Sequence, residues 1–496
     1  SAAAGSGKTA VLVERITRLI CDEGISFDEL IVMTFTKAAA QEMRERVERA
    51  MRDRLAEDPG NTHIRTQLAA IARARISTID SICQTLIKQY YQYLDIDPNF
   101  RVADEGELKI MRKDIIAELL EEKYEEADEA FMVLADSFVK KEDDSSIEEL
   151  IMKLFYAADN KTSPESFLEE LREEAVRETD GDYEASAWFK YFISYVNEAM
   201  EDYLELFEAA KDICGEADGP AKYIKDIELR EQLINKISGA DTYETLYKAV
   251  SEATFPKIST ITAKENVDPA KKAAVKNILD SLKKFINQLN EKVTVLTPEL
   301  LKTVISESAA VNKTVTELTA EFLRRYKAAK RDANIIDFGD MEHYAVELLY
   351  EEHEGEMRFS SIADELSRQL KEIMIDEYQD SNGVQDAILK ALSAERFGRP
   401  DIFMVGDVKQ SIYRFRKADP KVFTDKYDSF SAAGEHIKIE LNSNYRSRKE
   451  VVDSVNAVFD KIMRRELGGV EYDEAARLNA GASYVDNVLI NESGEA

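Results

Sequence analysis

The chain has 496 residues, of which 44% are hydrophobic, and it carries 66 basic against 97 acidic residues, a net charge of −31. At about 150 residues per domain this length predicts about three domains, and the apolar content excludes a disordered chain. The three cysteines are few and odd in number, which excludes a disulfide scaffold and favours a reducing, cytoplasmic setting. We find no apolar run of about 18 residues and no signal-peptide pattern, and so expect no membrane span.

The negative charge is unevenly distributed. Residues 1–101 carry 14 basic and 14 acidic residues, residues 102–330 carry 31 and 49, and residues 331–496 carry 21 and 34. A net −31 argues against nucleic-acid binding only if the charge is spread evenly. One stretch within the acidic background is locally basic and is a candidate for phosphate contacts: Lys409, Arg414, Arg416, Lys417 and Lys421.

The first residues form a phosphate-loop pattern with one departure, Ala2 in place of the first glycine. The pattern consists of Ala2, Ala3, Ala4, Gly5, Ser6, Gly7, Lys8 and Thr9. Backbone N–H groups of such a loop cradle phosphates, its lysine reaches the β- and γ-phosphates, and its threonine binds Mg²⁺. A strand normally precedes this loop. We therefore expect the chain to be a fragment that lacks at least its first strand.

Short apolar runs then alternate with helical patterns. Each run ends abruptly in polar or small residues, and the runs lie at 30–33, 75–77, 373–375 and 402–405, with a helical pattern such as 38–50 after each. Continuous apolar strands alternating with helices predict an α/β fold with a parallel sheet covered on both faces. Ligands of such sheets bind at the carboxyl ends of the strands. The polar residues after each run are therefore expected at one edge of the sheet.

The middle of the chain follows a different pattern. From 102 to about 330 it is mostly helical, with amphipathic stretches at 109–124 and 314–330 and breaks at Pro256, Pro269 and Pro298. We interpret it as a helical insertion that splits the sheet domain in sequence. A strand predicted at 436–441 opens a second α/β domain.

Several side chains at the predicted sheet edge suit triphosphate hydrolysis. Asp376 and Glu377 follow an apolar strand; the first suits the Mg²⁺ shell and the second suits activation of a water molecule. Gln410 follows the next strand and is placed to sense the γ-phosphate. Tyr445 offers a face for adenine and Arg446 a charge for the transition state, although an isolated Tyr-Arg pair is equally consistent with surface packing.

Aromatic residues recur beside these strand ends. Phe35, Tyr413 and Phe415 are interleaved in sequence with Arg414 and Arg416. Aromatic faces stack on bases at about 1–3 kcal/mol per base without sequence preference. Opening a base-pair step costs a similar roughly 0.6–2.2 kcal/mol, so stacking holds an opened strand but does not advance it. Phe35 taken by itself is as readily a core residue.

Taken together, these motifs resemble the UvrD/Rep-type superfamily 1 DNA helicases. The resemblance rests on five segments in order, at 5–9, 34–43, 375–381, 406–416 and 444–447. Within that family, residues 76–81, 94–98 and 415–420 are most similar to the AddA branch of helicase–nuclease proteins.

This resemblance implies a RecA-like P-loop fold and a 3′→5′ helicase that uses ATP and Mg²⁺. It assigns nucleotide contacts to the phosphate loop from Ala2 to Thr9 and to Tyr445 and Arg446. It assigns metal ligation to Thr9 and Asp376, and it assigns catalysis to Lys8, Asp376, Glu377, Gln410 and Arg446. It assigns DNA contacts to Thr34, Phe35, Thr36, Thr78, Tyr413, Arg414 and Phe415. Asp80 departs from the histidine that the family more often has, and we do not expect it to contact DNA.

The resemblance also implies a domain plan and a partner. Residues 1–101 and 331–435 are expected to form the first RecA-like domain (1A), 102–330 the helical insertion (1B), and 436–496 the start of the second RecA-like domain (2A). Motifs V and VI and a nuclease domain are missing from the chain. An AddB-type nuclease subunit is the expected partner, in double-strand-break repair and recombination. The alternatives are a stand-alone repair helicase of the same family and an ATP-dependent scaffold that does not unwind DNA.

Overall fold

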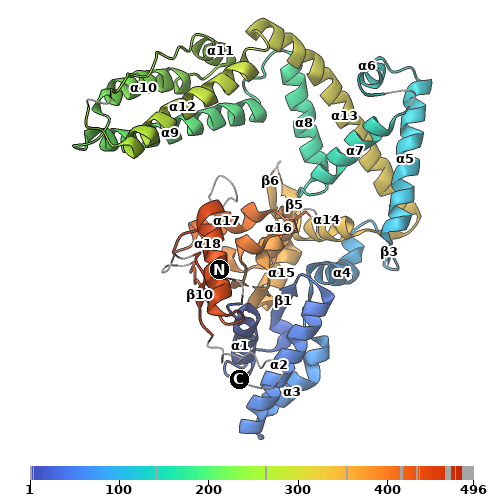
Figure 1. The fold of residues 1–496 in the computed structure, drawn as a ribbon. Helices are drawn as coiled ribbons and strands as arrows, with labels where there is room; N and C mark the ends of the chain where they lie inside the picture. The colour runs from blue at the N-terminus through green and yellow to red at the C-terminus, as the bar shows by residue number, and fades with distance from the viewer. Residues whose placement is uncertain are drawn as a thin grey trace, which may run out of the picture. The chain divides into compact units, whose positions relative to one another are not determined.

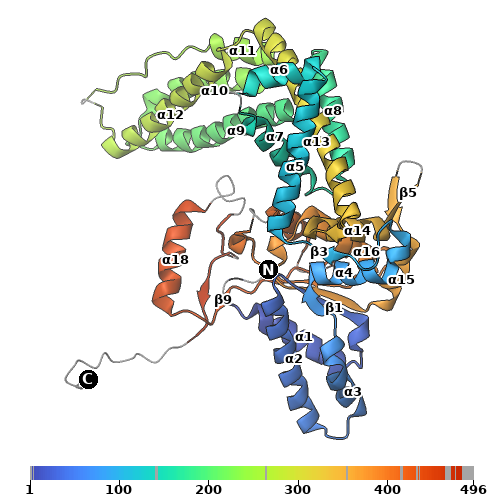
Figure 2. The ribbon, with the colours of Figure 1, turned by 90° about the vertical axis from the view of Figure 1, so that its right-hand side faces the viewer.

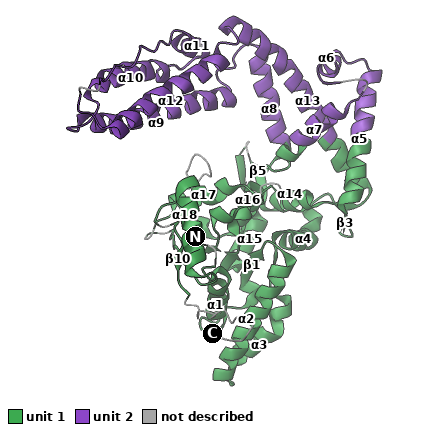
Figure 3. Ribbon diagram, in the orientation of Figure 1, with its two compact units in different colours: residues 1–115, 155–164, 323–496 green, residues 116–154, 165–322 purple. Residues whose placement is uncertain are grey.

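The computed structural model describes residues 3, 5–139, 143–262, 265–353, 356–413, 417–431, 434, 436–463, 471–474 and 476–482 (Figure 1). Two compact units divide the chain, as Figure 3 shows: unit 1 comprises residues 1–115, 155–164 and 323–496, and unit 2 comprises residues 116–154 and 165–322. Among the described residues, no helix is both long enough and apolar enough to cross a membrane.

Unit 1 is built on a four-stranded parallel sheet with the strand order β2–β1–β7–β8. The strands are β1 (Leu30–Thr34), β2 (Ile76–Thr78), β7 (Glu372–Ile375) and β8 (Ile402–Met404). Their register sets Thr34 opposite Thr78 and Met33 opposite Ile375. All four carboxyl ends therefore meet at one edge of the sheet, which confirms the predicted parallel sheet.

Helices cover both faces of this sheet because its strands are apolar on both sides. Ile31, Met33 and Ile373 pack into a core with α4 (Ile79–Tyr90), α14 (Phe338–Leu349), α15 (Ser361–Gln369) and α16 (Gly383–Leu392). Val32 and Met374 point the other way, into a core with α1 (Lys8–Cys21), α2 (Lys37–Glu57) and α3 (Thr62–Ala70). Figure 2 shows the two groups of helices on opposite sides of β1. Alternating residues of one strand thus serve two cores.

Unit 2 is helical. Its elements are the second part of α5 (Glu105–Glu125), α6 (Glu129–Phe138), most of α7 (Ser145–Ala158), α8 (Pro164–Thr179), α9 (Ala187–Gly215), α10 (Ile224–Ser238), α11 (Tyr243–Ser251), α12 (Pro269–Val293) and most of α13 (Pro298–Asp332). A core of its own joins α9, α10, α11 and α12. Pro269 and Pro298 each occupy the first position of a helix, where the missing N–H group costs nothing.

Smaller elements complete unit 1. They are β3 (Arg101–Val102), β4 (Ile335–Ile336), β5 (Tyr350–His353), β6 (Glu356–Phe359), β9 (Ser443–Asn444), β10 (Asn479–Ala480), α17 (Pro420–Ser429), α18 (Lys449–Ile462) and the 3₁₀ turns η5 (Tyr378–Asp380) and η7 (Val408–Gln410). The helices predicted at 38–50, 109–124 and 314–330 fall within α2, α5 and α13.

The strand predicted at 436–441 is wrong. Ile437 forms only an isolated bridge with Ser431, and the side chains of Ile437 and Ile439 are exposed. A strand needs a neighbour to pair with along its length, and among the described residues this segment makes only isolated bridge pairings, at Ile437 and Leu441. Residues 436–482 belong to the same compact unit as the sheet, so a separate domain 2A stays a prediction.

Candidate functional site

The phosphate-loop segment leads directly into α1, whose N-terminal end is uncapped. Gly5 and Gly7 have φ angles of 69° and 90°, which favour glycine, and a Cβ on Gly5 would lie 2.8 Å from the Cβ atom of Arg446. The N-terminus of α1 has no side-chain cap and no acidic residue in its first turn. The buried Ser6 hydroxyl has no hydrogen-bond partner among the described residues. Donors are thus left for an anion at this helix N-terminus.

Lys8 is one member of a closed ring of hydrogen bonds. Its Nζ atom donates to Glu377 Oε2 at 2.8 Å and to Gln410 Oε1 at 3.2 Å. Gln410 Nε2 donates to Asp407 Oδ2 at 2.7 Å, and the Asp407 backbone N–H donates to Gln379 Oε1 at 2.9 Å. Gln379 Nε2 closes the ring by donating to Glu377 Oε2 at 2.8 Å. Residues from distant parts of the sequence are therefore held in one network.

Two members of this ring, Gln379 and Asp407, were not predicted as site residues. Both are almost completely buried, with exposed fractions of 1% each. Each stands inside a segment on which the family resemblance rests, two residues after Glu377 and three before Gln410. A polar residue shortly after an apolar strand is the sequence signal that points to them.

Asp376 and Glu377 lie directly after β7. The backbone N–H of Asp376 donates to Met33 O at 2.9 Å, which fixes the carboxylate at the end of the sheet. Glu377 has φ 54° and ψ 43°, a left-handed conformation that non-glycine residues seldom adopt and that recurs at functional sites. Burial and the neighbouring Glu377 carboxylate raise the pKa of Asp376 to about 6, while Lys8 opposes this shift.

The donor set at this edge fits a hard cation. Magnesium prefers one or two carboxylates together with hydroxyl, water and phosphate oxygens. Asp376 is a half-buried carboxylate whose charge is disfavoured by its surroundings, and a cation would relieve that cost. Thr9 is half-buried in the first turn of α1, and among the described residues its hydroxyl makes no hydrogen bond.

Residues 444–447 lie against the phosphate loop. Tyr445 N donates to Gly5 O at 2.9 Å, and the Asn444 carboxamide accepts from the N–H groups of Arg446 and Ser447 at 2.9 and 2.7 Å. The Tyr445 ring is exposed, and a Cβ on Gly481 would lie 2.7 Å from its Cε1 atom. The structure thus brings Tyr445 and Arg446 beside the phosphate loop. The backbone N–H of Ala3 also lies here and donates to Leu441 O at 2.8 Å.

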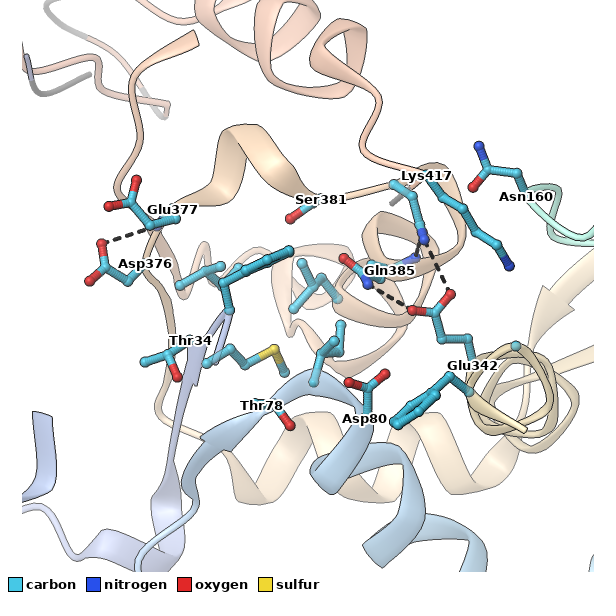
Figure 4. Close-up of a pocket in the computed structure, with 18 of the residues that line it drawn as sticks. Thr34, Thr78, Asp80, Asn160, Glu342, Asp376, Glu377, Ser381, Gln385 and Lys417 are labelled. Atoms are coloured by element: carbon cyan, nitrogen blue, oxygen red, sulfur yellow. Dashed lines mark hydrogen bonds between the residues drawn. The ribbon is translucent and has the colours of Figure 1, made fainter. Parts of the chain in front are cut away.

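A cavity of about 1030 Å³ opens beside Asp376 and Glu377 at the same edge of the sheet (Figure 4). It is lined by Thr34, Phe35 and Thr78, which the sequence predicted as DNA contacts. The Phe35 and Tyr413 rings stack, with centroids 4.7 Å apart. The Thr36 hydroxyl accepts from Ala39 N, and the Thr78 hydroxyl accepts from Ser81 N. Thr36 and Thr78 therefore cap α2 and α4.

The far wall of the cavity is acidic. In Figure 4 the Asp80 carboxyl lies between Thr78 and Glu342, and a dashed line joins Gln385 to Glu342. Gln385 Nε2 donates to Glu342 at 2.7 Å, and Asn382 Nδ2 donates at 3.2 Å. Burial, followed by the Glu342 charge, raises the pKa of Asp80 to about 6. Above that pH the Asp80 carboxyl is mostly ionised and would repel phosphate; that Asp80 does not contact DNA stays a prediction.

The locally basic stretch is partly neutralised. Lys409 Nζ pairs with Asp407 at 2.9 Å, and Lys417 pairs with Asp159. Four of the predicted site residues lie outside the described residues: Ala2, Ala4, Arg414 and Phe415.

Comparison with known proteins gives a consistent family. The ATP-dependent helicase/nuclease protein AddA of Lachnoclostridium phytofermentans is 40% identical over 492 residues, 98% of this chain and 36% of that protein. The protein of the same name from Clostridium botulinum is 37% identical over 501 residues, 99% of this chain and 40% of that protein. The chain thus spans about two fifths of the length of these relatives. The sequence model of the UvrD/REP helicase N-terminal domain matches residues 1–431. Because this match covers most of the chain, the chain belongs to the UvrD/REP helicase family.

Proposed function

We propose that this chain is the N-terminal motor part of an ATP-dependent, Mg²⁺-requiring 3′→5′ DNA helicase of double-strand-break repair and recombination. In this proposal the sheet of unit 1 is a RecA-like P-loop domain, and residues from 436 begin a second RecA-like domain. The relatives described above are helicase/nuclease proteins. Exonuclease activity is assigned to sequence beyond this chain, and an AddB-type nuclease subunit is the proposed partner, in the cytoplasm.

The observation that carries this proposal is the position of the Lys8 ring. Lys8, Glu377 and Gln410 are hydrogen-bonded at the sheet edge, and Glu377 also lines the cavity that contains Phe35. A phosphate-binding loop, a candidate base and a stacked aromatic pair therefore share one rim of one sheet. Because the two sites are adjacent, ATP hydrolysis at the first can change the affinity of the second for a nucleic-acid strand.

The ring also suggests how nucleotide binding proceeds. Lys8 exchanges its bonds to Glu377 and Gln410 for oxygens of the β- and γ-phosphates, while the N–H groups of the loop and of α1 hold the remaining oxygens. Glu377, released from Lys8 but still held by Gln379 at 2.8 Å, then accepts a proton from the attacking water. Gln410 remains tied to Asp407 at 2.7 Å and reports loss of the γ-phosphate to η7.

The remaining roles follow from position. Thr9 and Asp376 would hold Mg²⁺, which neutralises charge on the β- and γ-phosphates when bound. Arg446 lies beside Gly5 and would stabilise the transition state, an effect worth on the order of 10³–10⁵ in rate. Tyr445 would stack on adenine. Phe35 and Tyr413 would stack on DNA bases, with Thr34, Thr36, Thr78, Arg414 and Phe415 as further DNA contacts.

A glutamate substitution tests this function. In the full-length gene product that contains this chain, Glu377→Gln should reduce DNA-stimulated ATPase activity by at least roughly 10³-fold while single-stranded DNA still binds. Glu57→Gln, at an exposed position of α2, is the matched control and should leave the ATPase rate unchanged. An ATPase rate that single-stranded DNA does not stimulate in the unsubstituted protein would refute the helicase proposal.

A scaffold that binds ATP without unwinding DNA is the second candidate. It is suggested by the acidic, helical composition of residues 102–330, which carry 49 acidic against 31 basic residues. A scaffold would keep its partner in the Glu377→Gln variant and need no turnover, whereas a motor would stall. A stand-alone repair helicase would be indicated by a gene product without a nuclease domain.

A further inference from the structure

Unit 2 contains a pocket of about 470 Å³ that the proposed helicase mechanism does not use. It lies where the segment before α12 crosses α10 and α12. Its lining combines aromatic, hydroxyl and charged side chains, among them Tyr223, Arg230, Phe255, Lys257, Lys276 and Lys283.

This pocket is basic within an acidic part of the chain. Residues 255–284 carry seven lysines against three acidic residues, whereas the surrounding 102–330 carry 31 basic against 49 acidic residues. Lys272, Lys276 and Lys283 are spaced four and seven apart on α12, so they lie on one face of the helix, and all three line the pocket. Lys257, in the segment before α12, also lines the pocket. Lys271, their neighbour in sequence, instead pairs with Asp218 at 2.5 Å and with Glu216.

Arg230 is a second, independent observation that points to an anion in this pocket. Its side chain lines the pocket with an exposed fraction of only 2%, and its Nη1 atom donates to the backbone oxygen of Asp226 at 3.0 Å. The Asp226 carboxylate accepts from Ser259 N at 2.9 Å, and Arg230 forms no ion pair within the described part of unit 2. Its Nε atom is buried and has no hydrogen-bond partner among the described residues. A buried cation that forms no ion pair is destabilising, and an anion in the pocket would offset that cost.

We propose that this pocket binds a phosphate monoester of nucleotide size. The guanidinium of Arg230, with lysines from α12 and from the segment before it, suits a terminal dianion with three free oxygens, which offers more acceptors to these donors than a backbone diester does. The Phe255 ring, 6.0 Å from the Arg230 guanidinium carbon, offers an apolar face for the rest of the ligand. The carboxylate of Asp280 lines the pocket as well, but the four lysines and Arg230 still leave an excess of positive charge.

The same phosphate chemistry has two sources, a free mononucleotide and the 5′-terminal phosphate of a DNA strand. Both are tested by calorimetric titration of the 496-residue chain carrying Lys8→Ala, which removes phosphate binding at α1. The probes are thymidine 5′-monophosphate, thymidine, and a short oligonucleotide with or without a 5′-phosphate. We expect the monophosphate to bind and thymidine not to bind. Preference for the 5′-phosphorylated oligonucleotide over its 5′-hydroxyl form would assign the site to strand ends, and its absence would assign the site to free nucleotides.

Paired lysine variants supply the control. The double variant Lys276→Gln/Lys283→Gln should weaken monophosphate binding at least roughly 10-fold, while Lys284→Gln, adjacent in sequence but outside the pocket, should not. Circular dichroism checks the fold of Arg230→Met, which should also lose binding. Equal affinity in the double variant and the Lys284 control, or equal binding of thymidine and its monophosphate, would overturn the proposal. Because Lys8→Ala already disables the proposed ATPase site, this result is independent of whether the chain is a motor.

Discussion

Gln379 offers the sharpest test of the ring at the sheet edge. Gln379→Leu keeps the volume of the side chain but removes the donor to Glu377 at 2.8 Å and the acceptor of the Asp407 N–H at 2.9 Å. Asp407 has an exposed fraction of 1%, so its N–H would be left buried and unpaired, at a cost of about 1–3 kcal/mol. We expect this loss of positioning to lower the kcat of the DNA-stimulated ATPase by about 10–100-fold.

The KM for ATP should change little in this variant, because Gln379 supports Glu377 rather than the phosphate loop. Steady-state ATPase rates at saturating single-stranded DNA separate kcat from KM, and urea unfolding measures the accompanying loss of stability. Gln369→Leu, at an exposed position of α15, is the matched control. A kcat within about twofold of the control, or an effect confined to KM, would refute the positioning role of Gln379.

Three further substitutions test other parts of unit 1. Asp80→Asn should stabilise the fold at pH 7.5 by about 1–3 kcal/mol in urea unfolding, because the raised pKa of about 6 makes the charged form costly there. The sign follows from the folded pKa lying above the ordinary value, so the cost grows as pH rises from about 4 to 6 and the benefit of Asn vanishes near pH 4. Phe35→Ala should weaken single-stranded DNA binding by about 1–3 kcal/mol, or roughly 5–150-fold, in fluorescence anisotropy. Arg15→Met should destabilise the fold by about 3 kcal/mol in calorimetry, since it leaves the buried Glu372 carboxylate without its cation.

Each of these three predictions would be contradicted by a specific result. A stability gain from Asp80→Asn that is equal at pH 4 and pH 7.5 would exclude titration as its cause. DNA binding by Phe35→Ala equal to that of Tyr93→Ala, an exposed tyrosine outside the cavity, would exclude stacking by Phe35. An Arg15→Met/Glu372→Met double variant no more stable than Arg15→Met would show that the unpaired carboxylate is not what destabilises the single variant.

The sequence predicted the parts of this fold that depend on local pattern. Strands β1 and β7 are continuous apolar runs because both of their faces are buried, and such runs are visible without knowledge of the fold. The phosphate loop is recognisable because its glycines must adopt positive φ angles. The strand at 436–441 was predicted wrongly, because a strand requires a neighbouring strand to pair with, and a short local pattern does not encode one.

Interactions between distant residues were not predictable in the same way. Lys417 is basic in sequence, yet its charge is balanced by Asp159, 258 residues away. Gln379 and Asp407 meet only because the strands that precede them, β7 and β8, are neighbours in the sheet. Pairings of this kind depend on tertiary packing, which no local pattern encodes.

The strand order has a consequence for how this protein is made. β1 and β7 are adjacent partners, although Thr34 and Glu372 are separated in the chain by the 337 residues from 35 to 371. At about 5–20 residues per second a ribosome needs roughly 20–70 s to bridge that interval. During this time the nascent β1 can pair with β2 on one side, but its other edge stays unpaired until β7 has been synthesised. We therefore expect the helical unit to fold first during synthesis and the four-stranded sheet of unit 1 to close last, with early chain segments the most in need of chaperone protection.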